Sequence, residues 1–263
     1  MVWLKILRKE SRKIIRECIK QGFDGVSFSG GKDSLVLLTL AREIDPNIKG
    51  YFINTGAEDP SILKFVKNIP NIKWIYPKTN IKKVIKYYGY PIFNKELSQH
   101  IQSIRNGHNV RHKISPGQEF LLKAPFLISS DCCYFLKKAP ATKYKLMIGT
   151  KRTDSYLRAT SIKKYGLIHK NKAYPIANWN DHNINLYLAE NNIELPEIYT
   201  FQKNTGCLFC TFGILGDPFR FAKLKEHGPK LWNYMMNHLG MKDVLYWLCD
   251  NCDDITLESC GLK

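Results

Sequence analysis

The stretch that decides the fold is Phe23–Glu43, FDGVSFSGGKDSLVLLTLARE. Its first part, GVSFS, is rich in β-branched and aromatic residues, a composition that favours a short strand. Its last part, LVLLTLARE, has the pattern of a helix. SGGKDS, residues 29–34, separates the two. The sequence therefore predicts a strand, a glycine-rich loop and a helix in direct succession.

This loop has the features of an anion site. A glycine pair lets the backbone approach an anion closely, because no Cβ is in the way. The start of the following helix offers free N–H groups and the positive end of its dipole. Ser29 and Ser34 add hydroxyl donors, and Lys32 adds a positive charge. Asp33 is placed to cap the helix or to help hold Mg²⁺. The spacing differs from the Walker loop, which has four residues between its first glycine and Gly-Lys.

Residues 24–92 alternate strand and helix signals. GVSFS, IKGYFINTG and IKWIYP are typical of strands, whereas LVLLTLAREI and PSILKFVKNI are typical of helices. This order predicts an α/β fold: a parallel sheet with helices on both faces. Ligands of such sheets bind beyond the carboxyl ends of the strands. Both SGGKDS and Asn54-Thr55-Gly56 fall at such ends.

The charge of the chain favours a polyanionic partner. The 263 residues carry a formal net charge of +17, which is suited to nucleic acid or nucleotides. A lysine-rich composition with no nucleic-acid role is the alternative. No run of 18 apolar residues indicates a membrane span, and the first residues do not resemble a signal peptide. We expect a cytoplasmic protein with reduced thiols, and an oligomer is compatible with the sequence.

Three parts are predicted along the chain. Residues 1–22 form an amphipathic helix packed on the core. Residues 23–200 form the nucleotide-binding domain, with a basic insertion at about 95–130. Residues 201–263 form a cysteine-rich C-terminal region with helices at 217–227 and 229–248 and a short tail.

Four of the eight cysteines form a second motif. Cys132 and Cys133 are adjacent, and Cys207-x-x-Cys210 follows after a long gap. Four thiolates can bind zinc or hold an iron–sulfur cluster. Structural zinc sites normally use two spaced pairs, and an adjacent pair is awkward for that geometry.

Several segments resemble one protein family. SGGKDS after a strand resembles the PP-loop of the ATP pyrophosphatase superfamily. The order CysCys…CysXXCys resembles the [4Fe-4S] signature of adenylyl-sulfate and phosphoadenylyl-sulfate reductases, which share that fold. YFINTGAEDPSILKFV, IGTKRTDSYLR, PIANWNDHNINLYLAENNIELP and TGCLFCTFG resemble further segments of the family. The chain is thus identified as a member of the phosphoadenylyl-sulfate (PAPS) reductase-like branch of PP-loop proteins.

The resemblance implies roles for particular residues. The residues implied to bind the nucleotide and its phosphates, with Mg²⁺, are Ser29, Gly30, Gly31, Lys32, Asp33, Ser34, Asn54, Thr55, Gly56, Gly149, Lys151, Arg152 and Arg158. Among these, Lys151, Arg152 and Arg158 would neutralise phosphate or sulfate. Lys32 and Asp33 are the implied catalytic residues. Cys132, Cys133, Cys207 and Cys210 would hold a [4Fe-4S] cluster.

Two reactions are compatible with this family. The C-terminal LESCGLK resembles the reductase tail, whose cysteine attacks the sulfur of an adenylyl sulfate; here that residue is Cys260, which we expect to be accessible. Reductase loops usually lack the lysine, however, so the intact SGGKDS favours ATP. The predicted function is therefore an ATP pyrophosphatase that activates nucleic acid for sulfur incorporation, as in DNA phosphorothioation or tRNA thiolation. It would work with a cysteine desulfurase or a thioredoxin-like partner.

Two alternatives remain. One is an assimilatory sulfonucleotide reductase that forms sulfite with Cys260 as nucleophile. The other is a non-catalytic, cluster-bearing subunit of a sulfur-modification or defence complex. Cys249-x-x-Cys252 is interpreted either as a redox pair or as a coincidence of spacing.

Overall fold

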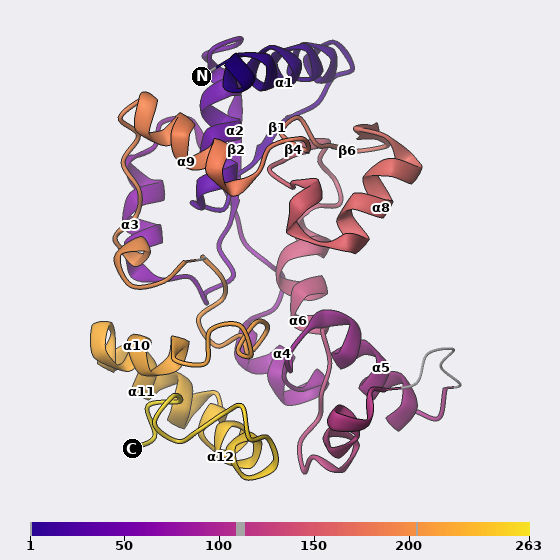
Figure 1. Cartoon of the computed structure of the whole chain (residues 1–263), viewed down its shortest axis with the longest axis vertical. Helices are drawn as coiled ribbons and strands as arrows, with labels where there is room; N and C mark the ends of the chain where they lie inside the picture. The colour runs from indigo at the N-terminus through magenta and orange to yellow at the C-terminus, as the bar shows by residue number, and fades with distance from the viewer. Residues whose placement is uncertain (1, 109–113, 204) are drawn as a thin grey trace. The chain divides into compact units, whose positions relative to one another are not determined.

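The computed structural model describes residues 2–108, 114–203 and 205–263 (Figure 1). Residues 109–113 of the predicted basic insertion lie outside the described residues. The chain divides into two compact units. Unit 1 comprises Met1–Asn54, Glu58–Tyr76 and Pro140–Thr205, and unit 2 comprises Thr55–Ala57, Pro77–Ala139 and Gly206–Lys263. The predicted boundary near 200 thus falls close to a change of unit, whereas residues 77–139 separate from the predicted nucleotide-binding domain.

Unit 1 is built on a sheet with the strand order β3-β2-β1-β4-β6-β5. The strands are β1 (Gly25–Ser27), β2 (Lys49–Ile53), β3 (Ile72–Ile75), β4 (Leu146–Ile148), β5 (Ile168–His169) and β6 (Lys172–Ala173). Neighbouring strands are parallel except for the antiparallel pair β5 and β6. The predicted α/β class with a parallel sheet is therefore confirmed. β1 is central, so the loop that follows it lies at the carboxyl edge of the sheet.

Polar caps mark where several helices of unit 1 begin. The Asp59 carboxylate accepts the Ser61 N–H at 2.8 Å, and Pro60 occupies the first position of α3 (Pro60–Asn68). The Asn180 side chain accepts the Asn183 N–H at 2.9 Å at the start of α9 (Asp181–Glu190). Such caps satisfy first-turn N–H groups that have no partner within the helix. Unit 1 also contains α1 (Val2–Lys20), α2 (Lys32–Arg42), η3 (Arg152–Asp154), α8 (Tyr156–Tyr165) and η4 (Glu197–Thr200).

The N-terminal helix α1 is amphipathic and packed on the core, as the sequence predicts. Leu4, Ile15 and Cys18 are buried in the same apolar cluster as the inner residues of α2. A buried polar link adds to this packing. Ser11 Oγ donates to the Pro175 carbonyl and accepts from Trp179 Nε1, each at 2.9 Å. Ser11 and Trp179 are both buried, each with an exposed fraction of 1%.

Unit 2 is largely helical. Its elements include α4 (Ile81–Tyr88), α5 (Lys95–Arg105), η1 (Pro116–Lys123), α6 (Asp131–Cys133), the π-helical turn η2 (Tyr134–Lys138), α10 (Arg220–His227), α11 (Pro229–His238) and α12 (Met241–Asn251); α7 (Ala139–Ala141) lies at the change of unit. Within the described part of the predicted insertion, the Arg105 guanidinium links the end of α5 to a later segment, because it donates to the carbonyls of Leu121, Leu122, Ala124 and Phe126. No helix in the described ranges is long and apolar enough to cross a membrane.

The single helix predicted at 229–248 is wrong, because it is broken at Gly240. This glycine has a left-handed φ of 68° between α11 and α12. A Cβ there would lie 2.5 Å from Tyr90 Oη, which itself donates to the Leu239 carbonyl at 2.9 Å. A tertiary contact thus fixes the break, and the apolar periodicity of the segment does not reveal it.

Replacing Ser11 by Ala tests the link between α1 and the core. The change leaves the buried Trp179 N–H without an acceptor, so we expect the free energy of unfolding to fall by about 2 kcal/mol. Urea unfolding of both variants measures the loss, with the exposed Ser161→Ala as control. If the two substitutions cost the same, the buried link does not contribute to stability.

Candidate functional site

The glycines of the loop are required by its geometry. Gly30 has a left-handed φ of 75°, and a Cβ on it would lie 2.8 Å from Ile62 Cγ2. A Cβ on Gly31 would lie 2.7 Å from Thr205 Oγ1. Gly31 is also the N-cap of α2, and as a glycine it has no side chain that could cap the helix. The first turn of α2 therefore keeps N–H groups directed at the loop, which is the arrangement that binds anions.

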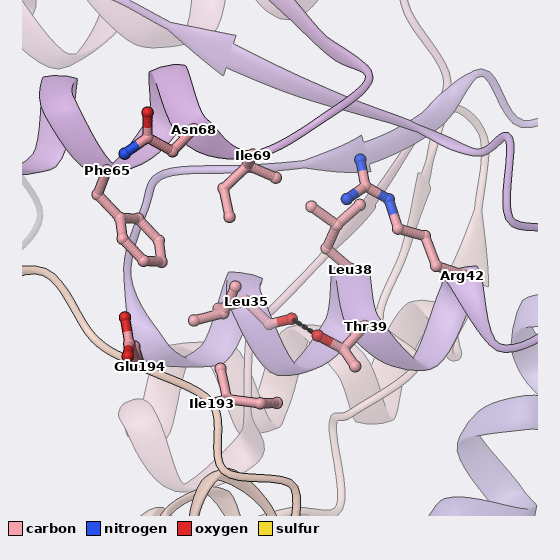
Figure 2. Close-up of a pocket in the computed structure, with 9 residues that line it drawn as sticks. All are labelled: Leu35, Leu38, Thr39, Arg42, Phe65, Asn68, Ile69, Ile193 and Glu194. Carbon is pink, nitrogen blue, oxygen red and sulfur yellow. Dashed lines mark hydrogen bonds between the residues drawn. The ribbon is translucent and has the colours of Figure 1, made fainter.

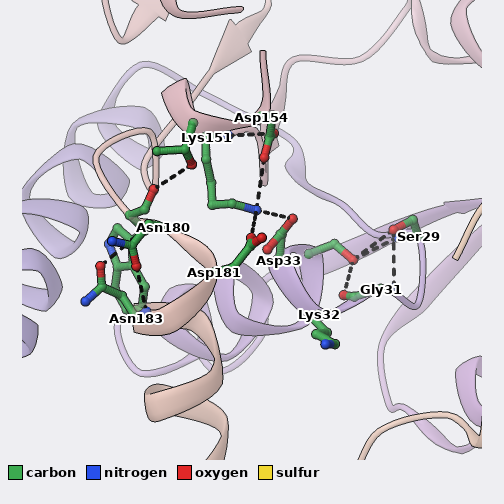
Figure 3. A network of polar contacts seen from close by, with 12 residues as sticks. Ser29, Gly31, Lys32, Asp33, Lys151, Asp154, Asn180, Asp181 and Asn183 are labelled. Carbon is green, nitrogen blue, oxygen red and sulfur yellow. Dashed lines mark hydrogen bonds and ion pairs between the residues drawn. The ribbon is translucent and has the colours of Figure 1, made fainter. Parts of the chain in front are cut away.

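The two serines hold the shape of the loop. Ser34 Oγ donates to the Gly31 carbonyl at 2.9 Å and accepts the Ser29 N–H at 3.1 Å. Ser29 Oγ accepts the Gly31 N–H at 3.3 Å. The prediction that these hydroxyls bind phosphate stays a prediction, but the structure gives them a role in the closed turn (Figure 3).

Tyr199 is a loop contact that the sequence did not reveal. The Lys32 N–H donates to Tyr199 Oη at 2.9 Å, and Lys32 Nζ lies 4.8 Å from the centroid of the same ring. Burial raises the pKa of Tyr199, so the hydroxyl stays neutral and serves as an acceptor. The neutral Tyr199 Oη thus accepts the Lys32 N–H, a donor that a bound anion could also use. No motif marks Tyr199, which is 167 residues from Lys32 along the chain.

A buried lysine joins the loop to two other elements (Figure 3). Lys151 Nζ lies 2.6 Å from Asp33 Oδ2, 3.1 Å from Asp154 Oδ1 and 3.2 Å from Asp181 Oδ1. The Lys151 side chain is only 3% exposed. The sequence predicts that Lys151 neutralises a bound anion. That role stays a prediction; the structure surrounds the Lys151 ammonium with three carboxylates, which join the start of α2 to η3 and α9.

Burial and ion pairing shift the pKa values of Asp33, Lys151 and Asp154. Burial raises the pKa of Asp33, and the hydrogen bond from Lys151 opposes that rise. Burial also acts to lower the pKa of Lys151, but its bonds to Asp33 and Asp154 hold the pKa above the usual value. For Asp154, hydrogen bonds from Lys151 outweigh burial and lower the pKa. Lys151 therefore stays charged as the common partner.

The other predicted nucleotide residues are placed differently. A Cβ on Gly149 would lie 3.0 Å from the backbone of Asp33, so only glycine lets β4 approach the loop this closely. Arg158 Nη1 pairs with Asp154 at 2.5 Å, and the exposed Arg152 donates its backbone N–H to Ala177. Asn54 ends a stretch of unit 1, whereas Thr55 and Gly56 belong to unit 2.

The four predicted cluster cysteines neighbour one another within unit 2. A hydrogen bond with Cys133, burial, and the nearby thiols of Cys210 and Cys207 raise the pKa of Cys132. The same hydrogen bond lowers the pKa of Cys133 to about 6, helped by Lys137. Burial raises the pKa of Cys210 to about 12.

That the four cysteines hold an iron–sulfur cluster stays a prediction. In the described part of the chain, no three His, Cys, Asp or Glu side chains are placed to hold one metal ion. A [4Fe-4S] cluster instead takes one thiolate at each of four irons, so its ligands need not converge on one point. Four neighbouring thiols are compatible with that requirement.

A second thiol group lies near the C-terminus. Cys249 Sγ and Cys260 Sγ are 3.9 Å apart, and the nearby Cys252 contributes to the raised pKa of Cys249, for which burial is the main cause. Burial raises the pKa of Cys260 to about 12. The exposed fraction of Cys260 is 0%. The expectation of an accessible Cys260 with a usable thiolate fraction is therefore wrong; its role as a nucleophile stays a prediction.

A separate hollow of about 360 Å³ lies along α2 in unit 1 (Figure 2). Its lining is Leu35, Leu38, Thr39, Arg42, Phe65, Asn68, Ile69, Ile193 and Glu194. None of the residues predicted to bind nucleotide belongs to this lining. The hollow is thus distinct from the loop.

The family follows from comparison with known proteins. Residues 25–212 match the phosphoadenosine phosphosulfate reductase domain, which is more than half of the 263 residues. The chain belongs to this family. The match contains the loop, the Lys151 network and the four predicted cluster cysteines, and it confirms the resemblance found in the sequence.

Two uncharacterized proteins of Methanocaldococcus jannaschii are similar to this family member. MJ0066 is 28% identical over 231 residues, covering 81% of this chain and 41% of the relative. MJ0973 is 25% identical over 242 residues, covering 86% of this chain and 51% of the relative. The chain thus spans about half the length, or less, of these two proteins.

Solved structures show more distant likenesses. PAPS reductase from Candida auris is 15% identical with a TM-score of 0.44, covering 78% of this chain and 93% of that one. FMN adenylyltransferase from Candida glabrata, in complex with ATP, is 15% identical with a TM-score of 0.43, covering 78% and 62%. The U34-tRNA thiolase NcsA from Methanococcus maripaludis, with its [4Fe-4S] cluster, is 13% identical with a TM-score of 0.40, covering 92% and 80%. TM-scores below 0.5 are too low to transfer a substrate or cofactor.

Replacing Lys151 by Met tests whether this residue organises the loop. The change removes the cation that pairs with Asp33, Asp154 and Asp181, whose side chains are 34%, 16% and 89% exposed. We expect a loss of about 3 kcal/mol in the free energy of unfolding, the low end for a broken buried pair, because Asp33 and Asp181 keep contact with solvent. Lys32→Met serves as the matched control, and urea unfolding measures both. Equal stability of the two variants would contradict the positioning role.

The burial of Cys260 predicts slow alkylation. Because the thiolate is the reactive form, native protein treated with iodoacetamide at pH 7.5 should be modified at the half-buried Cys252 well before Cys260. The Cys260 rate should rise about tenfold per pH unit below its pKa of about 12. Peptide mass spectrometry follows both sites. Labelling of Cys260 as fast as Cys252 at neutral pH would show an accessible tail.

Proposed function

We propose that this chain binds ATP at the SGGKDS loop, releases pyrophosphate and activates a nucleic-acid substrate for sulfur incorporation, in a reaction of the DNA phosphorothioation or tRNA thiolation type. The observation that carries this proposal is the loop itself. It combines a helix start whose N-cap is a glycine, a turn that only the glycine pair permits, and the charged side chain of Lys32. An anion with several charged oxygens, such as a pyrophosphate, matches these donors.

The proposed step is adenylyl transfer. An oxygen of the substrate attacks the α-phosphorus of ATP, the bond from that phosphorus to the bridging oxygen breaks, and pyrophosphate leaves. Negative charge grows on the leaving group, so the N–H groups of α2 and the Lys32 ammonium would stabilise it. Asp33, held by Lys151, is the proposed contact for Mg²⁺.

Sulfur handling is assigned to unit 2. Cys132, Cys133, Cys207 and Cys210 would hold a [4Fe-4S] cluster, which would act structurally or, if one of these thiolates is released from its iron, as a sulfur carrier. A cysteine desulfurase or a thioredoxin-like protein is the proposed source of sulfur or electrons. The net charge of +17 supports a nucleic-acid substrate.

The reductase alternative receives no support from the C-terminal tail. A tail nucleophile needs access to the substrate and a thiolate, whereas Cys260 is buried and burial raises its pKa to about 12. A non-catalytic subunit would bind no ATP productively. Pyrophosphate release therefore separates the proposed enzyme from both alternatives.

Replacing Lys32 by Ala tests the proposed step. Removing one charge-stabilising donor should lower the rate of pyrophosphate release from Mg-ATP by about a hundredfold. A coupled pyrophosphatase assay with mixed RNA or DNA present measures the rate, and the exposed Lys172→Ala is the matched control. An unchanged rate in Lys32→Ala, or none in the wild-type chain with either nucleic acid, would overturn the proposal.

A further inference from the structure

We infer that α4 and the segment following Cys133 form a docking surface for single-stranded nucleic acid, here called the α4 surface and made of Lys82, Lys83, Lys86, Tyr87, Tyr88, Tyr134, Phe135, Lys137 and Lys138. The inference rests on the proposed function in taking nucleic acid as the substrate. It adds where the strand lies and which chemical groups hold it. All of these residues belong to unit 2.

The lysines of α4 share its outward face. Ile81, Val84 and Ile85 are buried, which turns Lys82, Lys83 and Lys86 toward solvent. No carboxylate among the described residues pairs with these three lysines. Most of their charge is therefore left for an external anion.

Aromatic rings continue this face. Tyr87 is 66% exposed and Tyr134 is 52% exposed. Between them, the Tyr88 and Phe135 ring centroids lie 4.7 Å apart, and Phe135 and Tyr134 lie 5.2 Å apart. α4 packs against α6, which brings these rings together (Figure 1). Three of the four rings belong to tyrosine, whose polar hydroxyl is tolerated at a wet surface.

The two sequence segments that form the surface carry charge of one sign. Residues 78–93 contain four lysines and no acidic residue, and residues 132–145 likewise contain only basic charges. Asp131 lies next to this segment, but its carboxylate accepts a hydrogen bond from Gln102 Nε2 at 2.7 Å. The nearest acidic side chain along α6 is thus already engaged.

A single strand fits these groups better than a duplex or a membrane. Lysines contact phosphates, and exposed rings stack on unpaired bases, irrespective of sequence or sugar. A duplex hides its base faces. A membrane-binding helix would direct its aliphatic residues outward, whereas Ile81, Val84 and Ile85 of α4 are buried.

The position of the surface relates it to the cysteines. Cys133 directly precedes Tyr134 in the chain, so the aromatic row begins beside the adjacent cysteine pair. A strand bound along α4 would therefore pass close to the residues to which the proposed function assigns sulfur handling.

The test is fluorescence anisotropy of labelled 20-nucleotide single strands, RNA and DNA, with the full chain. The variant K82Q/K83Q/K86Q should bind both at least about tenfold more weakly at 100 mM salt. The slope of log K against log[salt] should fall in magnitude by about 2, since each lost phosphate contact contributes about 0.7. The control K5Q/K9Q/K13Q removes the same charge from exposed positions of α1 and should change binding less than threefold.

A second variant tests the rings. Y87A/Y134A should weaken single-strand binding at least about fivefold and leave the weaker binding to a duplex unchanged. Circular dichroism checks that the variants fold. Equal losses in both lysine variants would show a general charge effect and overturn the inference, as would tighter binding to duplex. Loss of binding to phosphatidylserine vesicles with oligonucleotide binding unchanged would identify a lipid surface instead.

ATP binding is measured on the same samples. If ATP binds normally and the α4 substitutions do not change oligonucleotide binding, the α4 surface is refuted. The proposed ATP site is then still supported. If the wild-type chain does not bind ATP, the proposed function is refuted. If only the α4 variants lose oligonucleotide binding, the α4 surface is still supported.

Discussion

The ammonium of Lys151 is the interaction on which the arrangement of the loop depends. It lies within 3.2 Å of carboxylates from α2, η3 and α9, which are Asp33, Asp154 and Asp181. One buried cation therefore fixes the start of α2 relative to the end of β4. The cost of burying it is offset by several partners rather than one. Because Asp33 is paired with Lys151, part of its negative charge is balanced at the start of α2.

The local part of this site could be predicted from the sequence, because its signals are local. A glycine pair after a strand indicates a loop that needs missing Cβ atoms, and the structure places both glycines against neighbouring side chains. Tyr199 and Asp181 could not be predicted. Their contacts with Lys32 and Lys151 join distant parts of the chain, and neither stands in a motif with its own chemistry.

In the C-terminal part, too, the sequence could not predict features that depend on contacts between distant residues. Apolar periodicity runs through residues 229–248, but Gly240 breaks the helix because Tyr90, far away in sequence, occupies the space of its Cβ. Cys260 is near the end of the chain, where exposure is the usual expectation. The structure buries it against Cys249 instead. Tertiary packing, which single-sequence patterns do not report, decides both features.

The residues of the proposed chemistry divide between the units. The loop and the Lys151 network belong to unit 1, whereas the four predicted cluster cysteines and the α4 surface belong to unit 2. The family domain at residues 25–212 includes parts of both. Nucleotide activation and sulfur delivery, as proposed, would thus rely on separately packed parts of the chain.

The central claim is that the loop grips the pyrophosphate of ATP. Isothermal titration calorimetry of the purified chain with Mg-ATP and, separately, with phosphoadenylyl sulfate tests it directly. The account predicts that ATP binds at least about tenfold tighter, a difference of about 1.4 kcal/mol, because only ATP offers a pyrophosphate to the N–H groups of α2 and Lys32. Tighter binding of phosphoadenylyl sulfate would contradict it.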